Sequence, residues 1–130
     1  MENKITWNLV VLEKKMKVKK SLKKNNNPDM LEVVKQTLLD DKVINLKIID
    51  IRKKSTFANF IILGSGTSSR HVNTMAKNIR EKIKKKFALN ASVEGIEQSN
   101  WVLIDASSLV INIFRPEVRE FYNLEKIWDN

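Results

Sequence analysis

Residues 64–72, Gly-Ser-Gly-Thr-Ser-Ser-Arg-His-Val, combine residue types that often do chemistry in α/β proteins. They follow an apolar run at 57–63, which predicts a buried strand, and they lead into a long amphipathic helical pattern. The segment is therefore a strand, a glycine-containing turn and a helix start that carries His71, the only histidine in the chain. Such a turn could cradle an anion, hold a catalytic group or simply make a tight corner.

The groups that usually act beside such a turn are missing from the sequence. Residues 64–66 are not followed by the Lys-Ser/Thr of a P-loop, and the chain is too short for a two-lobed dinucleotide site. Nucleotidyltransferases also place Gly-Ser after a strand, but they need paired carboxylates about a dozen residues later to hold two metals. Here the next acid, Glu81, stands alone, and no Asp adjoins His71 to orient it as a base. The sequence thus predicts no catalytic residue, no cofactor and no metal site.

Length and composition narrow the class of protein. A chain of 130 residues is expected to form one domain with a core of its own, and the absence of cysteine excludes disulfides, thiolate nucleophiles and zinc ribbons. The longest apolar runs are too short to span a membrane, and the N-terminus matches neither a signal peptide nor a transit peptide. We therefore predict a soluble, cytoplasmic protein.

The positive charge is concentrated in an N-terminal extension. Residues 1–28 carry eight Lys and two Glu, whereas residues 29–130 carry sixteen Lys or Arg and thirteen Asp or Glu. The extension is predicted to be flexible, or to be an overlong start with Met16 or Met30 as the true beginning. The alternative is an arm that contacts RNA without sequence preference.

Hydrophobic periodicity predicts the element order αββαβββα from residue 29 onward. The expected helices cover 29–41, 68–87 and a last segment that starts at Pro116; the expected strands cover 44–51, 57–63, 91–94, 101–105 and 109–114. The last helix should present one apolar face made of Val118, Phe121, Leu124 and Trp128. The fold class is therefore α/β, a mixed five-stranded sheet with helices packed on it.

The hairpin formed by 101–105 and 109–114 is apolar on both faces. If residue 105 pairs with residue 109, one face carries Trp101, Leu103, Leu109, Ile111 and Ile113 and the other carries Val102, Ile104, Val110, Asn112 and Phe114. Three helices are few for covering both faces, so either another chain hides part of this surface or the helices and the extension enclose it. The turn at 106–108 lacks glycine, so a left-handed residue there would be strained.

Taken together, four strings resemble the ribosomal silencing factor family, also called Iojap. They occur in the family's order across residues 29–130: Gly64-Ser65-Gly66-Thr67-Ser68-Ser69-Arg70-His71-Val72, then Glu94-Gly95, then Trp101-Val102-Leu103-Ile104-Asp105, and then Arg119, Tyr122, Leu124, Glu125 and Trp128. The chain departs from the usual family residues at Asn59, Ser107, Ser108 and Asn112, where Asp, Gly, Asp and His are typical.

The resemblance implies a fold similar to nucleotidyltransferases without their chemistry, and homodimers are common in the family. It implies binding to the large ribosomal subunit at its fourteenth protein, on the intersubunit face, which blocks joining of the small subunit. The family's contact surface centres on the Trp of the W-x-L-x-D strand, here Trp101 with Val102. Arg70 and His71 complete the predicted partner-binding set, although Arg70 could instead form a local salt bridge.

Two alternatives to a ribosome-binding repressor stay open at this point. One is a small nucleotidyltransferase-like enzyme that uses Ser65, Arg70 and His71; the missing acids argue against it. The other is a general RNA-binding module that uses the extension and Lys82–Lys86; the few aromatic residues argue against base stacking as its main mode. A repressor of the first kind could still make a weak contact with ribosomal RNA through the Lys-rich extension.

Overall fold

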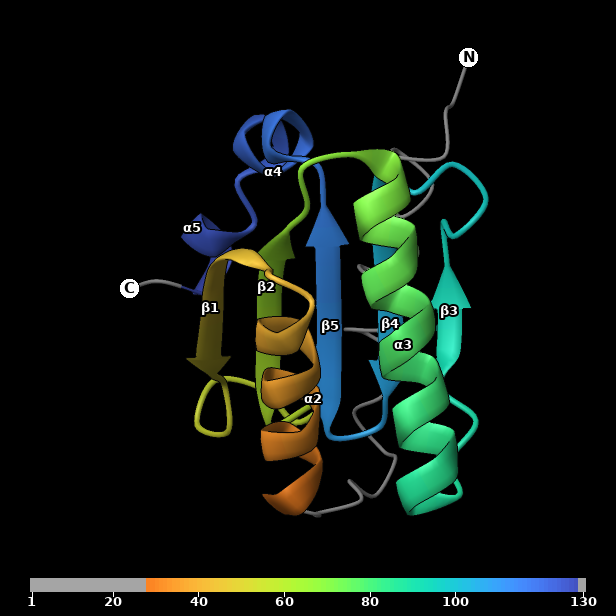
Figure 1. The fold of residues 1–130 in the computed structure, drawn as a ribbon. Coiled ribbons are helices and arrows are strands. Elements are labelled where there is room, and N and C mark those ends of the chain that lie inside the picture. The colour runs from red at the N-terminus through yellow and green to blue at the C-terminus, as the bar shows by residue number, and fades with distance from the viewer. Residues whose placement is uncertain (1–27, 129–130) are drawn as a thin grey trace.

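The computed structural model describes residues 28–128, and its elements follow the predicted order with one additional short helix (Figure 1). They are α2 (Pro28–Asp40), β1 (Ile44–Asp50), β2 (Phe60–Ser65), α3 (Ser69–Phe87), β3 (Ser92–Glu94), β4 (Trp101–Ala106), β5 (Leu109–Phe114), α4 (Pro116–Tyr122) and α5 (Glu125–Trp128). The predicted α/β class with a five-stranded sheet is confirmed. The extension at 1–28 lies outside the described residues except for Pro28, so its predicted flexibility stays a prediction.

The sheet is mixed, as predicted, with the strand order β1-β2-β5-β4-β3. Strands β2 and β5 run parallel, while the pairs β1–β2, β4–β5 and β3–β4 are antiparallel. A parallel pair needs a long crossover, and here the segment between β2 and β5 supplies it through α3, β3 and β4. This crossover brings the end of β2 beside the end of β5, where the predicted functional residues begin.

Helices α2 and α3 cover one face of the sheet, in front of it in Figure 1. Ser68 caps α3, because its Oγ accepts a hydrogen bond from the His71 backbone N–H, and Ala88 ends the helix in the left-handed conformation at φ 53°. The core of this face is almost entirely aliphatic. The helices contribute the buried side chains of Met30, Val34, Leu38, Val72, Met75, Ala76, Ile79 and Ile83; the strands contribute those of Ile62, Val102, Ile104, Ala106, Leu109, Ile111 and Ile113.

The opposite face carries a second core that contains aromatic residues. Its strand residues are Ile49, Ile61, Leu63, Trp101, Leu103, Val110 and Phe114. Ile51, Phe57 and Ala58 of the β1–β2 connection and Val118, Tyr122 and Leu124 of the C-terminal segment also belong to it. Both faces of the hairpin are therefore buried, and α4 and α5 lie near one end of the sheet (Figure 1).

The hairpin register differs from the expected one by one residue. Ala106 pairs with Leu109 and Asp105 pairs with Val110, so the turn contains only two residues, Ser107 and Ser108. A shift of one residue moves every side chain of β5 to the other face, and Trp101 consequently shares its face with Phe114 and Asn112. The turn contains the left-handed residue that would be strained without glycine, because Ser107 has φ 65°. Its N–H donates to Asp105 Oδ1 at 3.2 Å, which partly offsets that strain.

The expected single C-terminal helix is broken, and this part of the prediction is wrong. Asn123 adopts φ 47° and its N–H donates to the Arg119 carbonyl, which ends α4 before α5 begins. The break buries Leu124 but leaves Phe121 79% exposed, so Phe121 does not belong to an apolar face packed on the core. The side chain of Trp128, also expected on that face, lies outside the described residues. Among residues 28–128, no helix is both long and apolar enough to cross a membrane.

Candidate functional site

The glycines of residues 64–72 permit close packing. Strand β2 runs to Ser65 instead of ending at residue 63, so Gly64 lies in the strand, where a Cβ atom would stand 2.6 Å from Val43 Cγ2. At Gly66 a Cβ atom would stand 2.9 Å from Val72 Cγ2 and 3.0 Å from the Val72 backbone nitrogen. Of the three roles expected for this turn, the structure assigns its glycines that of a tight corner between β2 and α3.

His71 joins the start of α3 to the residue that follows α2. Its Nδ1 accepts a hydrogen bond from the Thr67 backbone N–H at 2.9 Å, so the ring proton belongs on Nε2, which lies 2.7 Å from the Asp41 carbonyl oxygen. Both ring nitrogens are thus engaged with the backbone. Arg70, one residue earlier, is exposed, and its side chain makes no hydrogen bond or ion pair with the described residues.

The other polar side chains at the start of α3 fix the loop at 95–100. Ser69 Oγ donates to Asn100 Oδ1 at 3.1 Å, and Asn73 Nδ2 donates to the Ile96 carbonyl at 3.1 Å. Within residues 28–128, no group of three or more His, Asp or Glu side chains could hold a metal ion. The arrangement can therefore position α3, the loop and β4 relative to one another.

Trp101 is buried at the start of β4, with only 1% of its surface exposed. Its Nε1–H donates to Asn112 Oδ1 at 2.9 Å, and its ring centroid lies 5.5 Å from that of Phe114 and 5.3 Å from that of Tyr122. Val102 is fully buried on the opposite face, under α3. Neither side chain offers surface to a partner in this conformation, so any role in partner binding must act through exposed neighbours.

An exposed aromatic side chain, Phe121, is linked to Trp101 through Tyr122, although its spacing predicted an apolar face packed on the core. Phe121 lies edge-on to Tyr122 at 5.0 Å, and Tyr122 in turn packs against Trp101. We call Phe121, Tyr122, Trp101 and Phe114 the aromatic cluster; it runs from the interior of the sheet to the surface. Asn123 was the signal that could have revealed it, because Asn readily takes the left-handed conformation that ends a helix.

The four predicted partner-binding residues belong to the same end of the sheet, although their side chains do not converge on one another. Asn100 precedes Trp101, and its side chain accepts a hydrogen bond from Ser69, which precedes Arg70. The Asn100 carbonyl also accepts a hydrogen bond from the Arg115 backbone N–H, just before α4. The starts of α3, β4 and α4 therefore meet at Asn100, and we call this region the Asn100 end.

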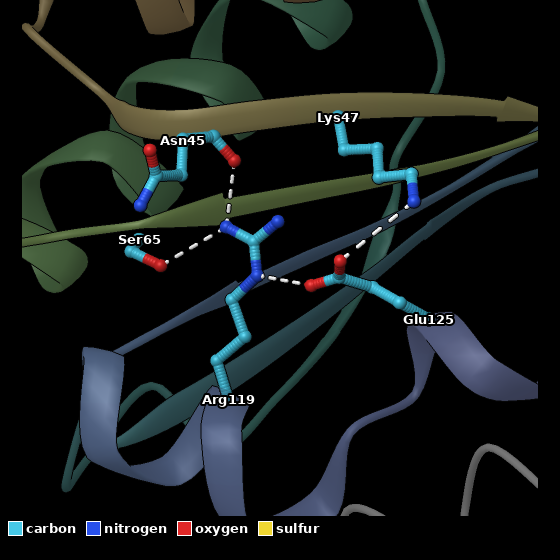
Figure 2. A network of polar contacts seen from close by, with 5 residues as sticks. All are labelled: Asn45, Lys47, Ser65, Arg119 and Glu125. Atoms are coloured by element: carbon cyan, nitrogen blue, oxygen red, sulfur yellow. Dashed lines mark hydrogen bonds and ion pairs between the residues drawn. The ribbon is translucent and has the colours of Figure 1, made fainter.

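A polar network that the sequence analysis did not anticipate attaches α4 and α5 to the sheet (Figure 2). Arg119 Nε donates to Glu125 Oε1 at 2.6 Å, and Arg119 Nη1 donates to the Asn45 carbonyl at 2.6 Å and to Ser65 Oγ at 3.1 Å. Lys47 Nζ lies 3.8 Å from Glu125 Oε2. The left-handed conformation of Asn45, at φ 51° beside an irregularity in the β1–β2 pairing, accompanies this contact.

This network, which we call the Arg119 network, has two consequences for the site. The Arg119 side chain is only 12% exposed, and its planar guanidinium contacts α5, β1 and β2 at once. It therefore fixes the position of α4, which carries Phe121 and Tyr122. It also engages the hydroxyl of Ser65, the residue that the enzyme alternative needed for chemistry.

Several known proteins that resemble this chain have names that refer to the ribosome. Residues 24–130 match the family model described as "Ribosomal silencing factor during starvation". The chain is 40% identical over 103 residues to the protein named ribosomal silencing factor RsfS from Zymomonas mobilis, an alignment that covers 78% of this chain and 77% of that protein. It is 27% identical over 101 residues to the mouse protein named mitochondrial assembly of ribosomal large subunit protein 1, covering 75% of this chain and 44% of that protein.

The fold also has a counterpart among solved structures. A crystal structure of a protein from Chromobacterium violaceum superposes with a TM-score of 0.76 at 27% sequence identity, covering 80% of this chain and 87% of that one. The family model covers most of this chain and begins four residues before α2. On this evidence, the chain belongs to the ribosomal silencing factor family.

Proposed function

We propose that this protein silences translation in the cytoplasm by binding the large ribosomal subunit and blocking the small subunit from joining it. The match of residues 24–130 to the family model is the observation that carries this proposal. The name of the mouse relative, which refers to the ribosomal large subunit, supports that choice of subunit. The binding site would be the fourteenth protein of the large subunit, on the intersubunit face, as the family resemblance implies.

The Asn100 end and the adjoining Phe121 are the proposed docking surface. Phe121 is 79% exposed, and an exposed aromatic side chain on a rigid support is the usual anchor of a protein interface. Trp101 would act indirectly, because it supports Tyr122, against which Phe121 packs. Arg70 and His71 lie at the start of α3, beside the same end of the sheet, where Arg70 is free to form an ion pair with a partner carboxylate.

The proposed mechanism is occlusion, which requires no chemical step. A protein seated on the subunit-joining surface excludes the small subunit sterically for as long as it remains bound. The contacts around residues 64–73 support this view, because His71, Ser69 and Asn73 already hold neighbouring segments together. They would serve to present a surface of fixed shape.

Cosedimentation with separated ribosomal subunits tests the proposal. The purified full chain should sediment with large subunits and not with small ones, and it should inhibit their association. Equal binding to both subunits that disappears at moderate salt would contradict the proposal, since it would indicate nonspecific electrostatic attraction.

A matched pair of variants tests the proposed surface. Phe121→Ala should weaken large-subunit binding by about 2 kcal/mol or more. Leu39→Ala is the control, because Leu39 is also an exposed apolar side chain, at 47%, but lies on α2 and not on α4. Equal effects of the two variants would overturn the assignment of the surface. Sedimentation velocity of the free protein would decide whether it also forms the homodimer that the family resemblance implies.

A further inference from the structure

Helix α3 supplies the net positive charge of residues 29–130. Residues 69–87 contain seven Lys or Arg and one Glu, a net charge of +6 with His71 neutral. The rest of residues 29–130 contains nine Lys or Arg and twelve Asp or Glu, a net charge of −3. The net positive charge of residues 29–130 therefore comes from α3, because the acids outnumber the basic residues in the rest of this region.

Helical geometry divides these cations into two groups. Arg70, Lys77 and Lys84 recur every seven residues, about two helical turns or about 10.5 Å, on the side of α3 that faces away from the sheet. All three are exposed, and none of their side chains makes a hydrogen bond or ion pair with residues 28–128. We call these three residues the outer row; Arg80 lies beside it.

The second group faces helix α2. Lys82 and Lys86 line hollows between the two helices together with Glu32 and Asp40 of α2, and Lys85 and Glu81 of α3 line one of these hollows. Those carboxylates lower the positive potential around Lys82 and Lys86. None of the outer-row residues lines these hollows with the acids of α2. The two groups thus have similar residue types but different electrostatic surroundings.

We propose that the outer row binds the phosphate backbone of double-helical RNA. A straight helix of 19 residues, about 28 Å long, holds the row in a rigid line that can follow a phosphate backbone. No aromatic side chain stands among the exposed residues of α3, so the face lacks the stacking groups used to bind single strands. The exposed positions of α3 also carry no large apolar side chain. A helix that binds a membrane surface needs such side chains on its exposed face.

This inference rests on the proposed function only for the location of the RNA. The outer row begins at Arg70, at the Asn100 end where the protein contact is proposed, and extends away from it along α3. A protein docked through that end would present the row to whatever lies beside the docking site, and on a ribosomal subunit that includes RNA helices. The row would add affinity and orientation, while the aromatic cluster would supply specificity.

Binding of the full chain to a labelled RNA duplex of about 16 base pairs, measured by fluorescence anisotropy over a series of salt concentrations, tests the proposal. Lys77→Gln combined with Lys84→Gln removes two charges from the outer row. Lys82→Gln combined with Lys86→Gln removes two charges from the flank and is the matched control. Gln and Lys have similar helix propensity, and the Lys-rich residues 1–28 are identical in both variants.

The outer-row variant should bind the duplex about ten-fold more weakly, and its slope of log affinity against log salt should fall by about two. The flank variant should stay within about two-fold of the wild type. Equal losses of affinity in both variants would overturn the proposal, because net charge alone would then explain binding. Unchanged affinity in both variants would also overturn it. Binding to phosphatidylserine vesicles that depends on the outer row, with unchanged duplex binding, would likewise overturn it.

Failure of this inference can be told apart from failure of the proposed function. Phe121→Ala should leave duplex binding unchanged, because Phe121 lies on α4 and not on α3. The outer-row variant should still prefer large over small subunits. If the wild-type chain showed no preference for large subunits, that result would count against the proposed function alone.

Discussion

The two faces of the sheet are stabilised in different ways. The face under α2 and α3 is filled by aliphatic side chains that helical and strand periodicity place there. The opposite face contains the aromatic cluster, the buried Trp101–Asn112 hydrogen bond and, at its edge, the Arg119 network. Burial of aliphatic groups is non-directional and tolerates small shifts, whereas hydrogen bonds to buried groups require fixed partners. The second face therefore depends more on single residues, and the proposed docking surface lies beside it.

The largest expected effect is at Trp101. Trp101→Ala should lower the free energy of unfolding by about 3 to 5 kcal/mol, because it removes a fully buried ring and leaves Asn112 without its partner. Urea denaturation followed by circular dichroism measures this loss. Trp101→Phe keeps most of the volume and separates the hydrogen bond from the packing. A stable Trp101→Ala protein that has lost only ribosome binding would show that Trp101 belongs to the interface and not to the core.

The Arg119 network should be the next most sensitive feature. Arg119→Gln should cost about 2 to 3 kcal/mol of stability, because the ion pair with Glu125 is partly buried and the Asn45 carbonyl loses its donor. It should also weaken large-subunit binding, since α4 would no longer hold Phe121 in place. Arg119→Lys should not restore either property, because a single ammonium group cannot reproduce the planar guanidinium that contacts Glu125, Asn45 and Ser65 together.

A control of the same chemical type sharpens that comparison. Arg52 pairs with Asp50 at 2.6 Å, but both side chains are largely exposed. Arg52→Gln should therefore lower the stability at neutral pH much less than Arg119→Gln does, because solvent screens an exposed ion pair. If Arg52→Gln proved as damaging as Arg119→Gln, burial would not be the reason for the importance of the Arg119 network.

The β4–β5 turn offers a stabilising change. Ser107→Gly should raise the free energy of unfolding by up to about 1 kcal/mol, because glycine adopts φ 65° without the steric cost that serine bears there. Denaturant midpoints of the two proteins would measure the gain. Ser108→Gly is the control, since Ser108 is not left-handed and the change should bring no gain. A loss of stability in Ser107→Gly would mean that the greater conformational freedom of glycine in the unfolded chain outweighs the relief of backbone strain.

The smallest effect concerns pH. Hydrogen bonds from Arg52 lower the pKa of Asp50 from 3.8 to about 2. Because the pKa is lower in the folded state, the pair stabilises the fold above pH 3.8, and this contribution disappears as the pH falls through about 2. Asp50→Asn should therefore flatten the pH dependence of the melting temperature between pH 4 and pH 2. Near pH 7 the slope of melting temperature against pH should be the same in both proteins. An unchanged acid profile would show that the pair does not persist in solution.

The sequence by itself determined the features that depend on neighbouring residues. The apolar spacing of α3, the order of the helices and strands along the chain, and Pro116 at the start of α4 are all local patterns, and the structure contains them. The ordered motifs around Gly64, Trp101 and Arg119 likewise identified the family. Each of these signals is read over a few residues and does not require knowledge of the chain path.

The tertiary structure alone decided which distant groups meet. The register of the hairpin depends on a two-residue turn, and a change of one residue reassigned every side chain of β5. Arg119 contacts Asn45, 74 positions away, and His71 contacts Asp41, 30 positions away. The exposure of Phe121 follows from a single left-handed residue, Asn123. These contacts depend on how all the strands and helices pack together. A hydrogen bond between distant residues, or the exposure of a ring, is set by elements that are far apart in the sequence.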